Sequence, residues 1–152
     1  MFAYRHSLFV LIIPLMTVLA GPALAFDKVN KSYFGGIALG GYDAVDYFTQ
    51  SKAVKGNKAH AAEWKGATWL FSSEANRGRF LADPEAFAPR YGGYCSNQMS
   101  LGHLSDIDPE VWRVIGGKLY LFGHEEGRVR WASETDKRIS EADRHWRTYL
   151  GR

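Results

Sequence analysis

The sequence predicts an α+β fold, with a small antiparallel sheet made from two hairpins, each followed by helices. Two segments, residues 62–71 and 111–122, carry this prediction, because each joins two short apolar runs through a glycine-containing turn. A helix-capping pattern follows each segment. The aromatic residues of the two hairpins are similarly placed, which indicates an internal duplication. The alternative is that two amphipathic hairpins look alike by chance.

The start of the chain has the pattern of a secretory signal peptide. A short basic stretch without acidic residues precedes an apolar run at residues 8–19, and residues 23–25 read Ala-Leu-Ala. This order is typical of a signal that is cleaved after a small-x-small site. We therefore predict a signal peptide at residues 1–25, cleavage after Ala25 and a single domain at residues 26–152. The expected location is periplasmic or secreted.

An uncleaved membrane anchor is the alternative for the same segment. A spanning helix needs roughly 20 apolar residues. The apolar run is shorter than that and contains Pro14. The sequence therefore favours cleavage, and we expect no stable membrane span afterwards.

Composition excludes some classes of protein and leaves others open. The chain has 19 basic and 16 acidic residues, a net charge of +3. This small excess indicates no nucleic-acid partner, because such binding usually needs a concentrated basic stripe. The single cysteine, Cys95, excludes a disulfide within the chain. It leaves a buried inert residue, a metal ligand or a reactive thiol as alternatives.

The first part of the chain is predicted as follows. Residues 42–48 read as a strand entered through a tight turn. The first hairpin pairs residues 62–64 with 68–71 around a Lys-Gly-Ala turn. Ser72 or Ser73 then caps a helix that runs to about Asp83, with Phe80 and Leu81 as its buried side.

The second part repeats the pattern. Short helices are expected at residues 85–91 and 94–101, and Asp108-Pro109 resembles a helix cap followed by proline. The second hairpin has its turn at Gly116-Gly117, and a helical region follows from Glu125. One apolar helical face is predicted, with a break near Thr135-Asp136. Its residues are Val129, Ala132, Ile139, Ala142, Trp146 and Leu150.

Several motifs resemble those of exported bacterial proteins of the YHS domain family. They are GYDAVDYF at residues 41–48, WKGATWLF at 64–71, NRGRFLADP at 76–84, YGGYC at 91–95, DPEVW at 108–112 and GKLYL at 117–121. The resemblance implies a small, often exported α+β domain of YHS-like fold. It also implies a metal ion or a metal-transport protein as partner, because relatives are fused to or encoded near heavy-metal transporters.

The chain departs from one branch of this family. In YHS domains attached to metal-pumping ATPases, a Phe-Cys-Ser-x-x-Cys segment follows the second hairpin strand. Here Ser72 and Asn76 replace both cysteines, and the opening Asp-Pro-Val-Cys-Gly is reduced to Asp43-Ala44-Val45-Asp46. We therefore do not carry over that metal site, and we expect Ser72 and Asn76 to be helix-capping residues.

The candidate metal ligands are Cys95, Met99, His103 and His124. The first three are spaced four apart, which places neighbours on one helical face. Thiolate, thioether and imidazole suit Cu(I) or another soft metal ion. Cys95 and His103 would be about 12 Å apart on a straight helix. The set therefore needs a helix end at Gly102, or one neighbouring pair helped by a more distant histidine: His60, His124 or His145.

The alternatives use the same cysteine differently. In the first turn of a helix, Cys95 would meet free N–H groups that favour the thiolate, which suits a redox thiol. No resolving cysteine is present, and no Gly-x-Ser-x-Gly motif indicates a serine hydrolase. We therefore favour a metal-binding or metal-sensing protein over an enzyme. A thiol-dependent redox protein or enzyme, or a structural interaction module with an inert Cys95, remains the alternative.

Overall fold

The computed structural model describes residues 26–151. The predicted signal peptide and its cleavage site lie outside this range. Among the helices of residues 26–151, none has both the length and the apolar character needed to cross a bilayer.

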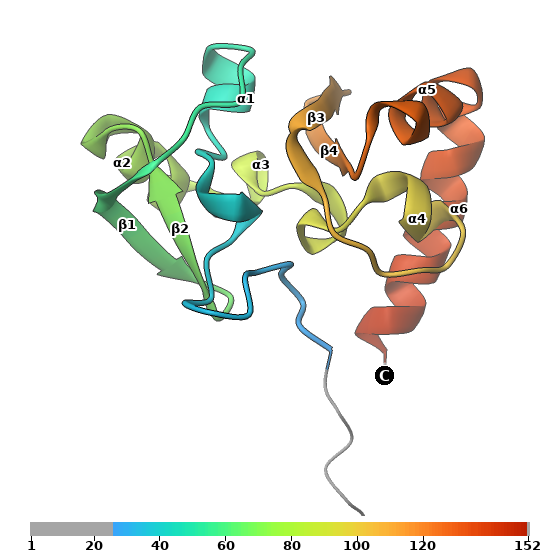
Figure 1. The fold of residues 1–152 in the computed structure, drawn as a ribbon, viewed down its shortest axis with the longest axis horizontal. Helices are drawn as coiled ribbons and strands as arrows, with labels where there is room; N and C mark the ends of the chain where they lie inside the picture. The colour runs from blue at the N-terminus through green and yellow to red at the C-terminus, as the bar shows by residue number, and fades with distance from the viewer. Residues whose placement is uncertain (1–25, 152) are drawn as a thin grey trace, which may run out of the picture.

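The described chain alternates short helices with two hairpins (Figure 1). The first hairpin and the helix behind it occupy one side of the molecule, and the second hairpin with the two C-terminal helices occupies the other. In chain order the elements are η1 (Leu39–Gly41), α1 (Asp46–Thr49), β1 (Asn57–Trp64), β2 (Ala67–Phe71), α2 (Glu74–Ala82), α3 (Pro84–Phe87), η2 (Arg90–Gly93), α4 (Ser96–Ser100), β3 (Asp108–Ile115), β4 (Lys118–Phe122), α5 (Glu125–Ser133) and α6 (Thr135–Leu150), where η marks a 3-10 turn.

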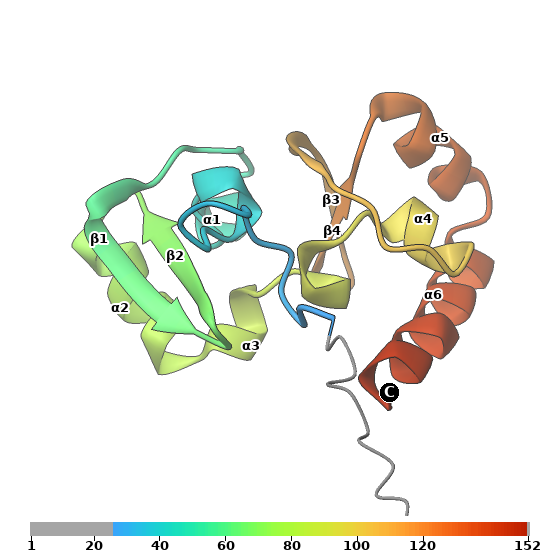
Figure 2. The same ribbon diagram turned by 60° about the horizontal axis from the view of Figure 1, so that its bottom comes forward.

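The predicted fold class is confirmed, because two antiparallel hairpins are each followed by helices. The hairpins do not join, however. Strands β1 and β2 form one two-stranded sheet, and β3 and β4 form another. Figure 2 shows α1 between the two hairpins, and the single sheet expected from the sequence does not form.

The two hairpins are built alike. Both residues of each turn have positive φ: 48° and 73° at Lys65-Gly66, and 56° and 71° at Gly116-Gly117. Such two-residue turns match the twist of antiparallel strands. Each first strand also has a register irregularity before it joins its partner. The predicted hairpins are thus confirmed, with longer first strands than expected.

A second feature repeats before each hairpin. Leu39-Gly40-Gly41 has φ values of 53°, 59° and 84°, and Tyr91-Gly92-Gly93 has 56°, 62° and 83°. A tyrosine follows each triplet, and then Asp43 in the first case and Cys95 in the second. The two halves therefore share element order, turn conformation and this unusual left-handed triplet, as a duplicated unit would.

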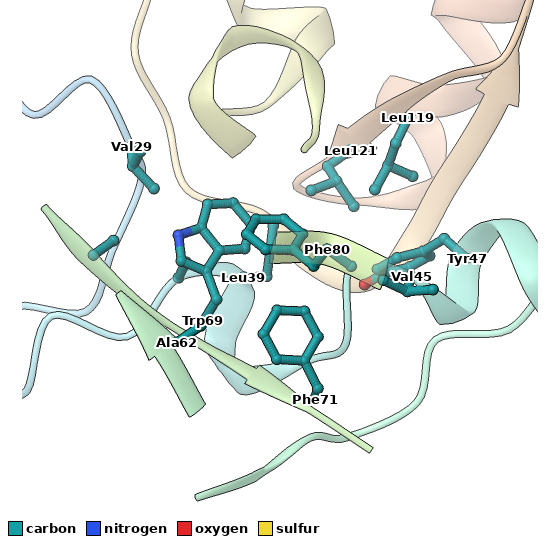
Figure 3. Packing of buried hydrophobic residues seen from close by; sticks show 13 residues of the cluster. Val29, Leu39, Val45, Tyr47, Ala62, Trp69, Phe71, Phe80, Leu119 and Leu121 are labelled. Atoms are coloured by element: carbon teal, nitrogen blue, oxygen red, sulfur yellow. The ribbon is translucent and has the colours of Figure 1, made fainter. Parts of the chain in front are cut away.

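Two buried clusters form the core. The first core cluster gathers around Trp69, Phe71 and Phe80 and includes Leu119 and Leu121 of β4 (Figure 3). The second core cluster consists of Tyr91, Cys95, Met99, Tyr120, Phe122, Trp131 and Ala142. Strand β4 contributes alternate residues to both clusters, because side chains along a strand point to opposite faces.

The prediction of a strand at residues 42–48 is wrong. The chain makes a turn there and then enters the short helix α1 at Asp46. Asp43 is the cause, since its buried carboxylate accepts a hydrogen bond from the Val45 N–H at 2.8 Å and curls the backbone.

The prediction of a helix cap at Asp108-Pro109 is also wrong. Strand β3 begins at Asp108, whose carboxylate accepts a hydrogen bond from the Glu110 N–H at 2.9 Å. Aspartate forms this local turn as readily as it caps a helix, and only the partner strand decides between them.

The C-terminal helices follow the prediction except for one part of the buried face. The break near residue 135 is confirmed, because Glu134 separates α5 from α6. Ala142 is buried as expected, but Val129, Ala132 and Leu150 of the predicted face are exposed, and Trp131 is buried instead. In α2, Phe80 is buried as predicted, whereas Leu81 is 45% exposed.

Candidate functional site

Cys95 lies at the N-terminal end of α4, where it is 2% exposed. Its N–H donates to the Ser105 carbonyl at 2.9 Å, and its carbonyl accepts from the Met99 N–H at 2.9 Å. The sulfur accepts a hydrogen bond from the Gly123 N–H at 3.3 Å. The cysteine is therefore an interior residue, held between α4 and the end of β4.

Met99 lies one helical turn beyond Cys95 and is completely buried. Both residues belong to the second core cluster, together with Tyr120, Phe122 and Trp131. The two sulfur-bearing side chains thus share one aromatic, apolar environment. Cys95 is the N-cap residue of α4 and has non-helical backbone angles, whereas Met99 lies within the helix.

His103 is on the surface, unlike the two sulfur residues. Gly102 ends α4 with a φ of +84°, and the His103 N–H donates back to the Gln98 carbonyl at 2.9 Å. The expected helix end is therefore present. The His145 ring packs over Gly102, within 3.2 Å of where a Cβ would lie.

His124 is the N-cap residue of α5. Its Nδ1 atom accepts a hydrogen bond from the Gly127 N–H at 3.1 Å, while its side chain is 51% exposed. Ser73 has the same position before α2, where its hydroxyl accepts from the Asn76 N–H at 3.2 Å. His124 is therefore the counterpart of Ser73 in the second half.

The structure does not bring the four candidate metal ligands together at one site. In residues 26–151, no group of three or more His, Cys, Asp or Glu side chains is placed to hold a metal ion. It brings Cys95 and Met99 into one buried cluster and leaves His103 and His124 exposed. The metal role of these four residues stays a prediction.

A buried polar cluster in the first half was missed by the sequence reasoning. It consists of Asp43, Asp46, Ser72 and Asn76. The Asn76 amide donates to a carboxylate oxygen of each aspartate at 2.8 Å, and the Ser72 hydroxyl lies 2.7 Å from Asp46 Oδ2. The expectation that Ser72 and Asn76 are capping residues is therefore wrong. Ser73 alone provides the side-chain cap of α2.

This cluster is fully hydrogen-bonded. Burial acts to raise the pKa of Asp46, but hydrogen bonds from Ser72, Gln50 and Asn76 outweigh it and hold that pKa below its usual value. The Asp43 carboxylate also accepts from the Ser72 N–H at 2.7 Å. Asp46, Ser72 and Asn76 converge at one point, because the Ser72 hydroxyl and the Asn76 amide both donate to the Asp46 carboxylate.

Cys95 is the second-half counterpart of Asp43. Both follow a left-handed Gly-Gly turn and a tyrosine, and both accept a hydrogen bond from the first backbone N–H after a hairpin. The donors are Ser72 and Gly123, respectively. Counting onward, Gly127 stands where Asn76 stands. The thiol therefore occupies the repeat-equivalent of Asp43 in the polar cluster, with glycines in place of Ser72 and Asn76.

Part of the chain, mainly its first half, is similar to a known protein family. Residues 45–91 match the family model of the YHS domain. The chain contains a YHS domain. The match runs from α1 to η2, so the YHS domain covers the first hairpin, and Cys95 lies just beyond its end. No curated protein and no solved structure matches the chain.

Proposed function

We propose that this YHS domain-containing protein binds or senses a soft metal ion, Cu(I) or one of similar chemistry, through Cys95 with Met99 as the second ligand. YHS domains are associated with metal handling in general. The observation that carries the proposal is that Cys95 and Met99 lie together in the second core cluster. Cys95 is also the repeat counterpart of Asp43, which is hydrogen-bonded to Ser72 and Asn76, two positions where the metal-pump branch of the family has cysteines.

The surroundings of the two sulfur atoms suit this ion. Thiolate and thioether are the ligands that select Cu(I). A monovalent cation bound to a thiolate has no net charge, so it loses little solvation in the second core cluster. The Gly123 N–H, which donates to Cys95 Sγ, would stabilise a thiolate further.

The same burial argues against the redox alternative. A thiol that exchanges with an external disulfide must be reached by its partner. Cys95 is 2% exposed and is the only cysteine in the chain, so no resolving thiol is available either. We therefore place metal binding ahead of thiol exchange and ahead of an enzyme activity at Cys95.

The test is competition for Cu(I) against a chromophoric chelator such as bicinchoninate. We expect Cys95→Ser to lose affinity by about a hundredfold or more, and Met99→Leu to lose about tenfold, because ligand loss exceeds typical outer-shell effects. His60→Ala, a histidine of the first half, is the control and should bind as the wild type does.

Circular dichroism of each variant separates loss of ligand from loss of fold. Copper-edge X-ray absorption of the loaded wild type should show a sulfur-only coordination shell. Equal Cu(I) affinity of wild type and Cys95→Ser would refute the proposal, and a coordination shell rich in nitrogen would refute the assignment of Met99.

A further inference from the structure

A cavity of about 340 Å³ lies where the first hairpin, η2, α6 and the start of the described chain meet. Its aromatic walls come from distant parts of the sequence: Trp64 and Trp69 line one part, and Tyr91 and Trp146 another. Trp64 packs edge-on against Trp69 with 5.6 Å between ring centroids, and Tyr91 against Trp146 with 6.3 Å. The walls are therefore fixed by mutual packing.

The charged residues around this aromatic cavity are mostly basic. Lys28, Lys65 and Arg90 line it, against one carboxylate, Glu85. The Lys65 ammonium is paired with Glu85 at 2.5 Å and lies 4.3 Å from the centre of the Trp64 ring. Lys28 makes no ion pair with another residue of the range 26–151. The cavity thus keeps an excess of positive charge.

Arg90 adds an unsatisfied donor. Its guanidinium pairs with Asp143 through an Nη atom at 2.7 Å. Its Nε–H is buried and has no acceptor among the described residues. Because Nε is not accessible from the cavity, Arg90 contributes to it through the positive charge of its guanidinium, which Asp143 partly compensates.

We propose that this cavity binds a small planar aromatic anion, of the class of aromatic carboxylates. The aromatic walls favour a flat ring, and the basic residues favour a negative charge on it. A neutral aromatic ligand would lose the charge interaction, and an aliphatic acid would lose the ring contacts. The cavity is lined by none of the candidate metal ligands, so it is a site separate from Cys95.

The experiment compares two probes of the same shape, 2-naphthoate and the neutral 2-naphthamide, by isothermal titration calorimetry on the whole protein. We expect saturable binding of naphthoate and binding of naphthamide at least about fivefold weaker. Lys28→Gln should weaken naphthoate about threefold and leave naphthamide unchanged. Lys28 is exposed, so this substitution does not threaten the fold.

Lys118→Gln is the matched control, because Lys118 is an exposed lysine beside the turn of the second hairpin. It should leave the affinity for both probes unchanged, as should Cys95→Ser. The proposal is overturned by the absence of saturable naphthoate binding, by equal affinity for the two probes, or by equal behaviour of Lys28→Gln and Lys118→Gln.

Discussion

At the scale of single residues, Gly92 is the position that the surrounding backbone restricts most clearly. It has a φ of +62°, and its carbonyl accepts a hydrogen bond from the Asn30 N–H at 2.8 Å. A Cβ at this position would lie 2.1 Å from the Lys28 carbonyl oxygen. Both the conformation and the space around it therefore require glycine, and the start of the described chain packs against η2 for this reason.

Replacing Gly92 with alanine should destabilise the protein more than the same change at Gly66. Gly66 has a φ of +73° but no atom within 4 Å of a Cβ, so Gly66→Ala carries only the conformational penalty, about 1–2 kcal/mol. Gly92→Ala adds a steric clash and should lower the free energy of unfolding by at least about 3 kcal/mol. Urea denaturation measures both losses. Equal losses would contradict the close approach of Lys28.

At the scale of elements, the two helices that follow the hairpins begin in the same way. Ser73 and His124 each accept the N–H of the residue three positions ahead, Asn76 and Gly127. Serine is a preferred N-cap residue and histidine is not. The equivalence therefore comes from position in the repeat and not from residue type.

Removing either cap should weaken the protein by a similar amount. We expect Ser73→Ala and His124→Ala each to lower the free energy of unfolding by about 1 kcal/mol, because a helix N–H loses its acceptor. His124→Ser should restore the loss, since it installs the cap of the first half. Thermal denaturation followed by circular dichroism measures all three. If His124→Ser is as unstable as His124→Ala, the capping role assigned to His124 is wrong.

At the scale of the whole molecule, the two halves are joined because residues of both are buried in the first core cluster. Leu119 and Leu121 of the second hairpin lie in the first core cluster. The Tyr47 hydroxyl donates to the Pro109 carbonyl at 2.8 Å, and its ring packs edge-on against Trp112. Burial raises the pKa of Tyr47, so the phenol stays a hydrogen-bond donor at ordinary pH. The core of the first half is therefore completed by residues of the second half.

The protein should therefore unfold in one cooperative transition. Leu121→Ala should lower the free energy of unfolding by about 2–5 kcal/mol without splitting that transition. Leu101→Ala is the control, because Leu101 is 51% exposed and should have little effect. Coincident urea curves from circular dichroism and tryptophan fluorescence are the expected result. Two separate steps in the wild type would show that the halves fold independently.

The sequence by itself determined the features that depend on neighbouring residues. Both hairpins, the cap at Ser73, the helix end at Gly102 and the break at Glu134 follow from local turn and capping chemistry. The motifs of the first half also indicated the YHS domain, because a motif consists of residue types in a fixed order along the chain.

Tertiary structure alone decided what depends on residues far apart in the chain. It made a turn and the start of the short helix α1 of residues 42–48, kept the two sheets separate and buried the Cys95 sulfur beneath Gly123. It also closed Asp43 and Asp46 against Asn76, some thirty positions away. Burial and hydrogen bonding over such separations are set by how whole elements pack, which no local pattern contains.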